Sequence, residues 1–217
     1  GIVCLVLVII ILLISYNLKN ALRSNRRIQE LLDKDELTAL YSINGFSSKW
    51  NQNVAKTHQQ DFALLYGDIC QFKIINDNFG FSTGNQVLRA CGTTLKNILA
   101  HDEFASRISA DHFAILLKYD GWENLLSRIE LFVKQLNSWR TEYSEIPYKI
   151  DFVFGVCLIG QEDRADIHQK LDFANYARRY AKDTPNNNFI VMYDEQMRNQ
   201  ALLGQQLEGD LDQALHN

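Results

Sequence analysis

The sequence predicts an α/β domain built around one central sheet. Short apolar runs that are typical of strands alternate with longer amphipathic segments that are typical of helices. Two of the apolar runs are separated by only Ser109, Ala110 and Asp111, which is the pattern of an antiparallel hairpin. Hydrophobic residues make up 47% of the 217 residues, which is ample for the core of one domain with attachments.

Composition excludes some classes of protein. The formal net charge of −4 gives no support for a nucleic-acid binder, and no basic stripe interleaved with aromatic residues is present, so we expect no direct nucleic-acid binding. The four cysteines are widely spaced without a CxxC pair, which argues against a zinc site or a disulfide framework and favours a reducing compartment.

Residues 1–16 are expected to form a transmembrane segment. Ile2 to Ile14 is an unbroken apolar run, shorter than the roughly 20 residues of a full span, and the chain starts without a methionine, so we expect the span to be truncated. A buried core strand or helix is the alternative. Lys19 and three arginines follow the run, so we expect the rest of the chain to lie in the cytoplasm.

Residues 17–34 are expected to form a helical signalling linker. Its seam positions are three and four residues apart, as in a short coiled coil with a polar residue that sets the register. The seam consists of Leu18, Ala21, Asn25, Ile28 and Leu32. We expect it to join two chains into a homodimer. A single amphipathic helix lying on the domain is the alternative.

Residues 35–193 are expected to form the globular domain. Asp35 to Leu40 opens it, and Gly80 and Gly84 bracket a predicted turn. Helices are predicted at 46–58, 85–99, 122–139 and 164–182, and strands at 62–69, 104–108, 112–117, 149–159 and 189–193. Residues 194–217 are polar and expected to be a helical linker.

Several motifs in one order resemble the GGDEF (diguanylate cyclase) family. They are Asp35-Glu36-Leu37-Thr38-Ala39-Leu40, the strand that ends near Asp68, the stretch from Phe72 to Gly80, and Gly84-Asn85 with the residues after it. The resemblance covers roughly Asp35 to Tyr193. It implies a ferredoxin-like, nucleotidyl-cyclase-like mixed β-sheet flanked by helices. It also implies a bacterial protein, with the apolar segment in the inner membrane and the domain in the cytoplasm. The tail resembles linkers that lead to an EAL phosphodiesterase domain, which would then be an adjacent partner.

The resemblance also implies a site for GTP and Mg²⁺. Asp68, the carbonyl of Ile69 and Asp111 would be metal ligands, Lys73 would contact phosphate, and Asn76 and Asn85 would lie at the guanine. Taken singly, Asp68 could be a strand-end cap and Lys73 a solvated helix residue. Their occurrence together in the family's order favours the site.

Departures from the family pattern gather at this same site. The signature loop reads Ser109, Ala110, Asp111, His112 and Phe113. Two side chains stand where the family has glycines, which allow positive φ, and His112 replaces an acidic residue next to the metal ligand.

Further departures lie around the loop. Asn85 and Cys70 each replace an aspartate, and Ala100 and Glu103 occupy the family's Arg-x-x-Asp product-inhibition site. Because catalytic groups act as a unit, we expect no functional catalytic residues in this loop.

Three hypotheses follow. The first is a degenerate, inactive GGDEF domain that acts as a dimerising relay in a membrane-bound cyclic di-GMP protein, with GTP as a regulatory ligand. The second is an active but divergent diguanylate cyclase that converts two GTP to cyclic di-GMP. The third is a protein-interaction platform in a GGDEF-EAL regulator.

Overall fold

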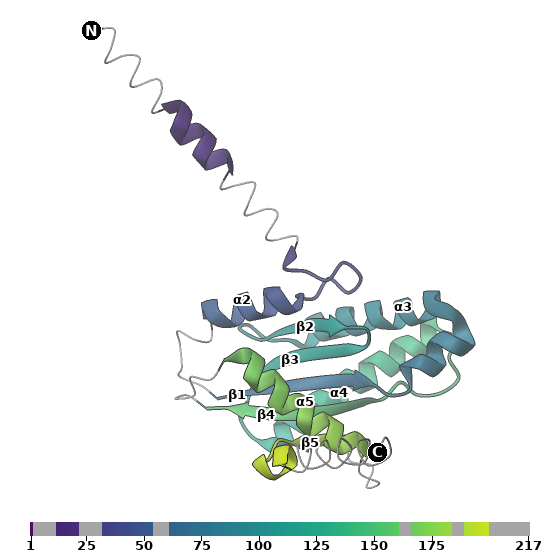
Figure 1. Ribbon diagram of the computed structural model, residues 1–217. Coiled ribbons are helices and arrows are strands. Elements are labelled where there is room, and N and C mark those ends of the chain that lie inside the picture. Colours follow the sequence, from purple (N-terminus) through teal and green to yellow (C-terminus); the bar gives the residue numbers. More distant parts are fainter. Residues whose placement is uncertain (2–11, 22–31, 54–60, 161–165, 184–188, 200–217) are drawn as a thin grey trace, which may run out of the picture.

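The computed structural model describes residues 1, 12–21, 32–53, 61–160, 166–183 and 189–199. Their β-strands form one sheet in the order β2-β3-β1-β4-β5, with helices on both faces (Figure 1). The strands are β1 (Phe62–Ile69), β2 (Phe104–Ser109), β3 (His112–Lys118), β4 (Phe152–Ile159) and β5 (Ile190–Met192). The helices are α2 (Ile43–Asn53), α3 (Phe72–Ile98), α4 (Trp122–Tyr143) and α5 (Ile167–Asp183). The predicted mixed sheet flanked by helices is thus present.

Strand β1 is the centre of the sheet. It pairs antiparallel with β3 on one side and with β4 on the other, and all eight of its residues are buried. A strand covered on both faces needs apolar residues along its length, which is why its sequence is almost continuously apolar. The register places Asp68, next to the end of β1, opposite His112 of β3. The two side chains therefore meet at the same end of the sheet.

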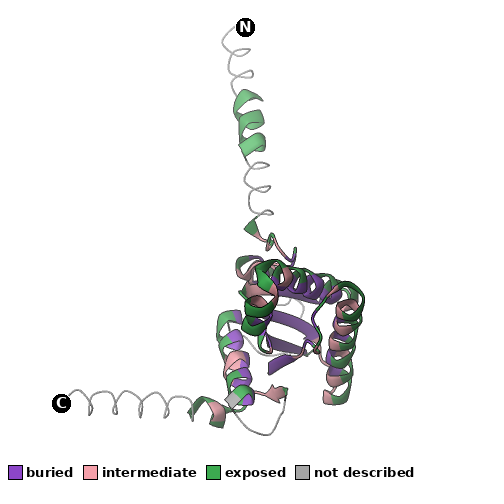
Figure 2. Cartoon of the chain, turned by 90° about the vertical axis from the view of Figure 1, so that its right-hand side faces the viewer, coloured by how far each residue is buried: buried purple, intermediate pink, exposed green. Residues whose placement is uncertain are grey.

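Two hydrophobic layers cover the sheet. On one face, α3 and α4 pack through residues such as Leu95 and Phe132. On the other face, α2 and α5 pack through residues such as Phe46 and Leu171. Figure 2 shows the buried strands enclosed between these partly exposed helices. Alternate residues of β1 consequently face different helical layers, and Asp68 faces the layer that contains α5.

Helix α3 differs from the sequence prediction. It begins at Phe72 rather than at Asn85, and its backbone leaves helical geometry only at Gly80, where φ is 81°. The predicted turn bracketed by two glycines is wrong at Gly84, which is helical and buried. A Cβ at Gly84 would collide with Oδ1 of Asn76, so this glycine lets the two helical segments lie close together.

Strand β4 begins at Phe152, three residues later than predicted. The preceding backbone is bound to α4 instead: Asn137 Nδ2 donates to the carbonyl of Ile150, and the Ile150 N–H donates to Asn137 Oδ1, at 2.8 and 2.9 Å. Apolar character alone does not reveal this competition between a side-chain amide and the sheet ladder.

The edge of the sheet at β2 is partly covered by the start of the domain. Tyr41 forms a bridge with Ser106; its N–H donates to the carbonyl of Ala105 and its own carbonyl accepts from Arg107. These bonds attach the segment after Asp35 directly to the hairpin strand.

The N-terminal predictions concern residues that are mostly outside the described part of the chain. Residues 12–21 are helical. Among the described residues, no helix is both long and apolar enough to cross a membrane. Residues 2–11 of the apolar run, residues 22–31 of the linker seam and the tail from 200 onward are not described. The transmembrane segment and the coiled coil therefore stay predictions.

Candidate functional site

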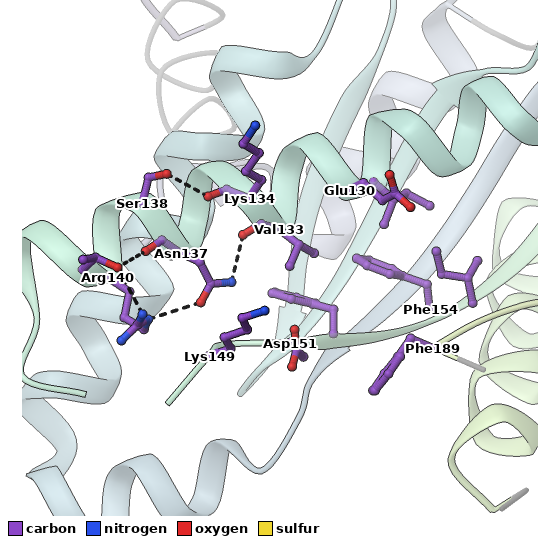
Figure 3. A pocket seen from close by; sticks show the side chains of 14 residues that line it. Glu130, Val133, Lys134, Asn137, Ser138, Arg140, Lys149, Asp151, Phe154 and Phe189 are labelled. Atoms are coloured by element: carbon purple, nitrogen blue, oxygen red, sulfur yellow. Dashed lines mark hydrogen bonds between the residues drawn. The ribbon is translucent and has the colours of Figure 1, made fainter. Parts of the chain in front are cut away.

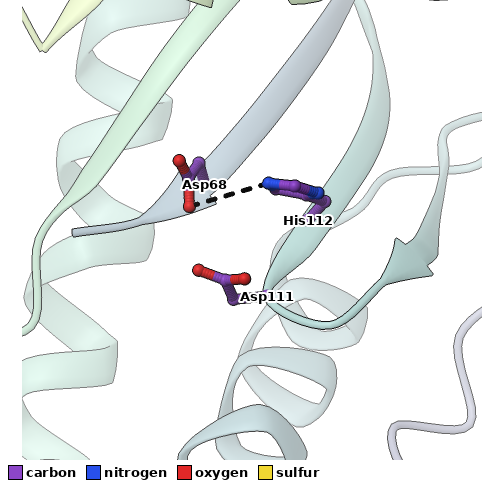
Figure 4. Close-up of side chains that lie close together, drawn as sticks. All are labelled: Asp68, Asp111 and His112. Carbon is purple, nitrogen blue, oxygen red and sulfur yellow. Dashed lines mark ion pairs between the residues drawn. The ribbon is translucent and has the colours of Figure 1, made fainter. Parts of the chain in front are cut away.

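Three titratable side chains meet at the end of β1. Asp68 is almost completely buried, His112 opens β3 opposite it, and Asp111 lies in the hairpin turn (Figure 4). One ligand atom from each lies within 4.8 Å of the others, and His112 Nε2 is 3.9 Å from Asp68 Oδ1. The structure thus brings together the two carboxylates that the sequence analysis selected, and adds an imidazole.

The hairpin turn keeps an unusual backbone conformation. Ala110 has a φ of 45°, in the left-handed region that favours glycine. Arg107 Nε donates a 2.8 Å hydrogen bond to the Ala110 carbonyl, which holds the turn in place. Ala110 therefore keeps the positive φ that glycine allows in the signature loop, although it carries a methyl group.

Two cations of α5 bind Asp68 from above the sheet. Arg178 Nη1 and Lys182 Nζ lie 2.7 and 2.8 Å from Asp68 Oδ2. Arg178 is 8% exposed, its Nε donates to Asn175 Oδ1, and its guanidinium lies over the ring of Tyr66. One carboxylate oxygen thus accepts from two cationic side chains.

These contacts set the protonation states of the cluster. Burial raises the pKa of Asp68, but its hydrogen bond with Asp111 and the charges of Lys182 and Arg178 outweigh burial, so the pKa lies below its usual value. Burial and the neighbouring Asp68 raise the pKa of Asp111 to about 6. Burial, together with the two cations, lowers the pKa of His112. At neutral pH the imidazole is therefore uncharged and Asp68 is ionised.

The remaining predicted site residues lie on β1 and α3. Ile69 is buried directly after Asp68, whereas Lys73 and Asn85 are exposed on α3. Asn76 is half-buried and lies against Gly84. Their roles toward metal, phosphate and guanine stay predictions.

The opening motif of the domain is tied to the hairpin. Asp35 Oδ1 accepts from the N–H and the hydroxyl of Thr38 at 2.8 and 2.7 Å. Arg107 Nη1 lies 3.3 Å from Asp35 Oδ2. The same arginine that holds the Ala110 carbonyl therefore also holds the first residue of the domain.

Glu103 has an internal role. Its Oε1 accepts from Arg128 Nη1 at 2.6 Å and from the N–H of Lys118 at 2.9 Å, and its Oε2 accepts from the N–H of Ala100 at 2.8 Å. The carboxylate is fully engaged within the fold. The absence of a product-binding site at these positions stays a prediction.

A groove of about 660 Å³ lies on the other face of the sheet from Asp68, between α4 and the β4–β5 edge. Figure 3 shows Phe154 and Phe189 on one side of it, with Glu130 and Asp151 closer to them than Lys134 and Lys149. No predicted site residue lines it.

Comparisons with known proteins agree with the motif order. A family model described as "Diguanylate cyclase, GGDEF domain" matches residues 32–188. The chain is 26% identical over 175 residues to the "Probable diguanylate cyclase DgcT" of Escherichia coli K12, covering 79% of this chain and 38% of that protein. It is 27% identical over 196 residues to the "Bifunctional diguanylate cyclase/cyclic di-GMP phosphodiesterase MucR" of Pseudomonas aeruginosa, covering 89% and 28%. The chain thus spans less than two fifths of either relative.

Solved structures share the fold. The coiled coil and GGDEF domain of DgcB from Caulobacter crescentus, in complex with c-di-GMP, superposes with a TM-score of 0.66 at 20% identity and covers 82% of this chain and 94% of that one. The S helix-GGDEF-EAL structure of Vibrio cholerae LapD, bound to c-di-GMP, gives 0.63 at 15% identity, covering 89% and 46%.

Sequence reasoning missed the cations of α5. Arg178 and Lys182 are four residues apart within a predicted helix, so a shared face was visible in the sequence. What the sequence did not contain was a signal that this face turns toward Asp68, 110 residues earlier.

Proposed function

Because the chain belongs to the GGDEF diguanylate cyclase domain family, we propose that it is a catalytically silent GGDEF domain that relays a signal in a cyclic di-GMP pathway. Its family and its place in cyclic di-GMP signalling rest on the match over residues 32–188. The loss of catalysis and the role as a relay are the content of the proposal.

The observation that carries the proposal is the position of His112 opposite Asp68. Joining two GTP requires Mg²⁺ held by hard oxygen ligands, charge neutralisation at phosphate and an oriented 3′-hydroxyl. His112 stands where the resembled family has an acidic residue, with its Nε2 3.9 Å from Asp68 Oδ1. A neutral imidazole is a poor partner for Mg²⁺, so one oxygen donor is replaced at the reacting end of the site.

The hairpin turn supports the same proposal. A cyclase needs the loop backbone to approach the nucleotide closely, and glycine provides that room. Ser109 and Ala110 each add a side chain where the resembled family has glycine, while Arg107 holds the turn through the Ala110 carbonyl. The loop then keeps its shape but presents side chains where backbone was needed.

The relay rests on a continuous set of contacts. The linker leads into Asp35, Asp35 binds Arg107, and Arg107 binds the Ala110 carbonyl. Displacing the start of the domain would therefore pull directly on the hairpin. We further propose that this domain follows a membrane anchor, pairs with a second copy through residues 17–34 and precedes an EAL domain, with GTP as a regulatory ligand.

The test is an assay of cyclase activity with matched variants. The purified chain is incubated with GTP and Mg²⁺, and cyclic di-GMP is quantified by mass spectrometry. We expect no product above that of the Asp68→Ala and Asp111→Ala variants. Product that depends on both carboxylates would overturn the proposal. Titration calorimetry of GTP on the same samples measures the regulatory binding separately.

A divergent cyclase is the second candidate. It is favoured by the adjacency of Asp68 and Asp111 and by the positive φ that Ala110 retains. Restoring the loop as Ser109→Gly, Ala110→Gly and His112→Glu in one variant distinguishes the two. An inactive parent supports the silent domain, and any gain of activity in the variant then traces the loss to the loop. An active parent supports the divergent enzyme.

A further inference from the structure

The buried guanidinium of Arg178 is the feature of the site that motifs did not suggest. It is 8% exposed, it bonds Asp68 Oδ2 at 2.7 Å, and it makes further contacts with Asn175 and Tyr66. A buried arginine with this many partners is fixed in place, because moving it would leave a charge without solvent or partner.

The fold brings Arg178 to Asp68 by a close approach of α5 to the sheet. Gly155 of β4 lies directly under the backbone of Ala174 and Arg178, where a Cβ would collide with both. Because Gly155 pairs with Tyr66 in the neighbouring strand, Arg178 reaches across β4 toward the end of β1. The contact is therefore a product of backbone packing and not of a flexible surface side chain.

Cationic side chains of the same chain already compensate the negative charge of Asp68. Oδ2 accepts from Arg178 and Lys182, and Oδ1 faces His112. A divalent cation needs carboxylate oxygens that are free to enter its coordination shell. To bind here it would have to break two charge-assisted hydrogen bonds and approach a buried guanidinium. The residues present thus do not fit a Mg²⁺ site, although Asp68 and Asp111 alone would.

We propose that Arg178 is the resident cation of this site and takes the place of the divalent metal at Asp68. Lys182, which is more exposed, adds a second cation at the same carboxylate oxygen. The domain then keeps the end of β1 charge-balanced without metal. This inference rests on the proposed loss of catalysis and gives it a physical cause beyond the altered loop.

The test measures metal binding and not activity. Mn²⁺ serves as the probe, and the loss of its free-ion electron paramagnetic resonance signal reports binding. We expect the native chain to show no saturable Mn²⁺ site up to millimolar concentration. We expect Arg178→Met to gain one Mn²⁺ site that saturates at a concentration at least tenfold below that limit. Arg178→Met combined with Asp68→Asn should lose this site. Arg179→Met, an exposed position on the same helix, is the matched control and should resemble the native chain.

Two results would overturn the assignment. One is a saturable Mn²⁺ site in the native chain that Asp68→Asn removes, and the other is a folded Arg178→Met variant without any gain. If Arg178→Met does not fold, the Tm of the native chain in EDTA and in Mn²⁺ decides the question. An unchanged Tm supports the proposal. A Tm that Mn²⁺ raises, in a way that Asp68→Asn abolishes, contradicts it. Since cyclic di-GMP is not measured, failure here is separable from failure of the proposed function.

Discussion

Arg107 Nη1 lies 3.3 Å from Asp35 Oδ2, and this ion pair joins the first residue of the domain to the hairpin that carries Asp111. Both side chains are largely buried, with exposures of 16% and 23%. Thr38 adds two hydrogen bonds to the same carboxylate. Burial raises the pKa of Asp35, but these bonds and Arg107 outweigh it and hold the pKa below its usual value.

Asp35→Asn should weaken this junction. The amide keeps the shape but loses the charge, so we expect the free energy of unfolding to fall by about 1–2 kcal/mol. Urea denaturation followed by circular dichroism measures it. Glu36→Gln, one residue away and exposed, is the control and should change stability by less than about 0.5 kcal/mol. Equal effects of the two variants would contradict a specific role for the pair.

Glu103 should make stability depend on pH. Burial raises the pKa of its carboxyl, but the hydrogen bond from Arg128 and two backbone N–H groups outweigh burial and lower the pKa. An acid whose pKa is lowered by folding stabilises the fold above its unfolded pKa, and that contribution is lost as pH falls through the folded value. Glu103→Gln should therefore cost about 2–4 kcal/mol at pH 7 and progressively less below about pH 4.5.

Thermal unfolding of the native chain and Glu103→Gln from pH 7 down to about pH 2.5 checks this dependence. The exposed Glu130→Gln variant of α4 should track the native curve throughout. A constant gap between native and Glu103→Gln across the range would mean that the ionised carboxylate is not the stabilising form.

Ala110→Gly should stabilise the domain. The left-handed conformation costs an L-residue about 1–2 kcal/mol, and glycine removes this strain. The greater conformational freedom of glycine in the unfolded chain offsets about 0.4–1 kcal/mol of the stabilisation. We expect a net increase of about 0.5–1 kcal/mol in the free energy of unfolding. Ala100→Gly, at an exposed position without positive φ, should have the opposite sign. Destabilisation by both substitutions would show that Ala110 is not strained.

Gly155→Ala should lift α5 from the sheet. The added methyl would meet the backbone of Ala174 and Arg178, which cannot move as a side chain can, so we expect a loss of about 2–3 kcal/mol. Gly160→Ala is the control, because the nearest atom to its Cβ would be Asp61 Oδ1 at 4.0 Å. Chemical denaturation of both variants gives the comparison, and similar small effects would contradict close packing at Gly155.

The sequence predicted the sheet well where burial and turn chemistry act locally. Phe62–Ile69 has the predicted bounds because a strand covered on both faces must be apolar throughout. The hairpin was visible from three small residues, two of them polar, between two apolar runs. The start of β4 was misplaced because Asn137, a polar residue on α4, binds the backbone of Ile150.

The site could be predicted only in part, because one of its contacts depends on tertiary packing. Asp68 and Asp111 were selected from motif order, and the antiparallel register of β1 and β3 brings them together. The contact of Arg178 with Asp68 depends on how closely α5 packs over Gly155, which is a property of the tertiary structure. Residue spacing along a helix indicates a shared face but not what that face meets.

The bridge from Tyr41 to Ser106 bears on how two copies of this domain could associate. An exposed edge strand can recruit an identical chain through its unpaired amides and carbonyls, the route to domain swapping and to fibrils. Here Tyr41 already saturates amide and carbonyl groups of β2 at Ala105 and Arg107. At these positions of β2 the chain's own opening segment therefore occupies the groups that a strand of a second copy would need.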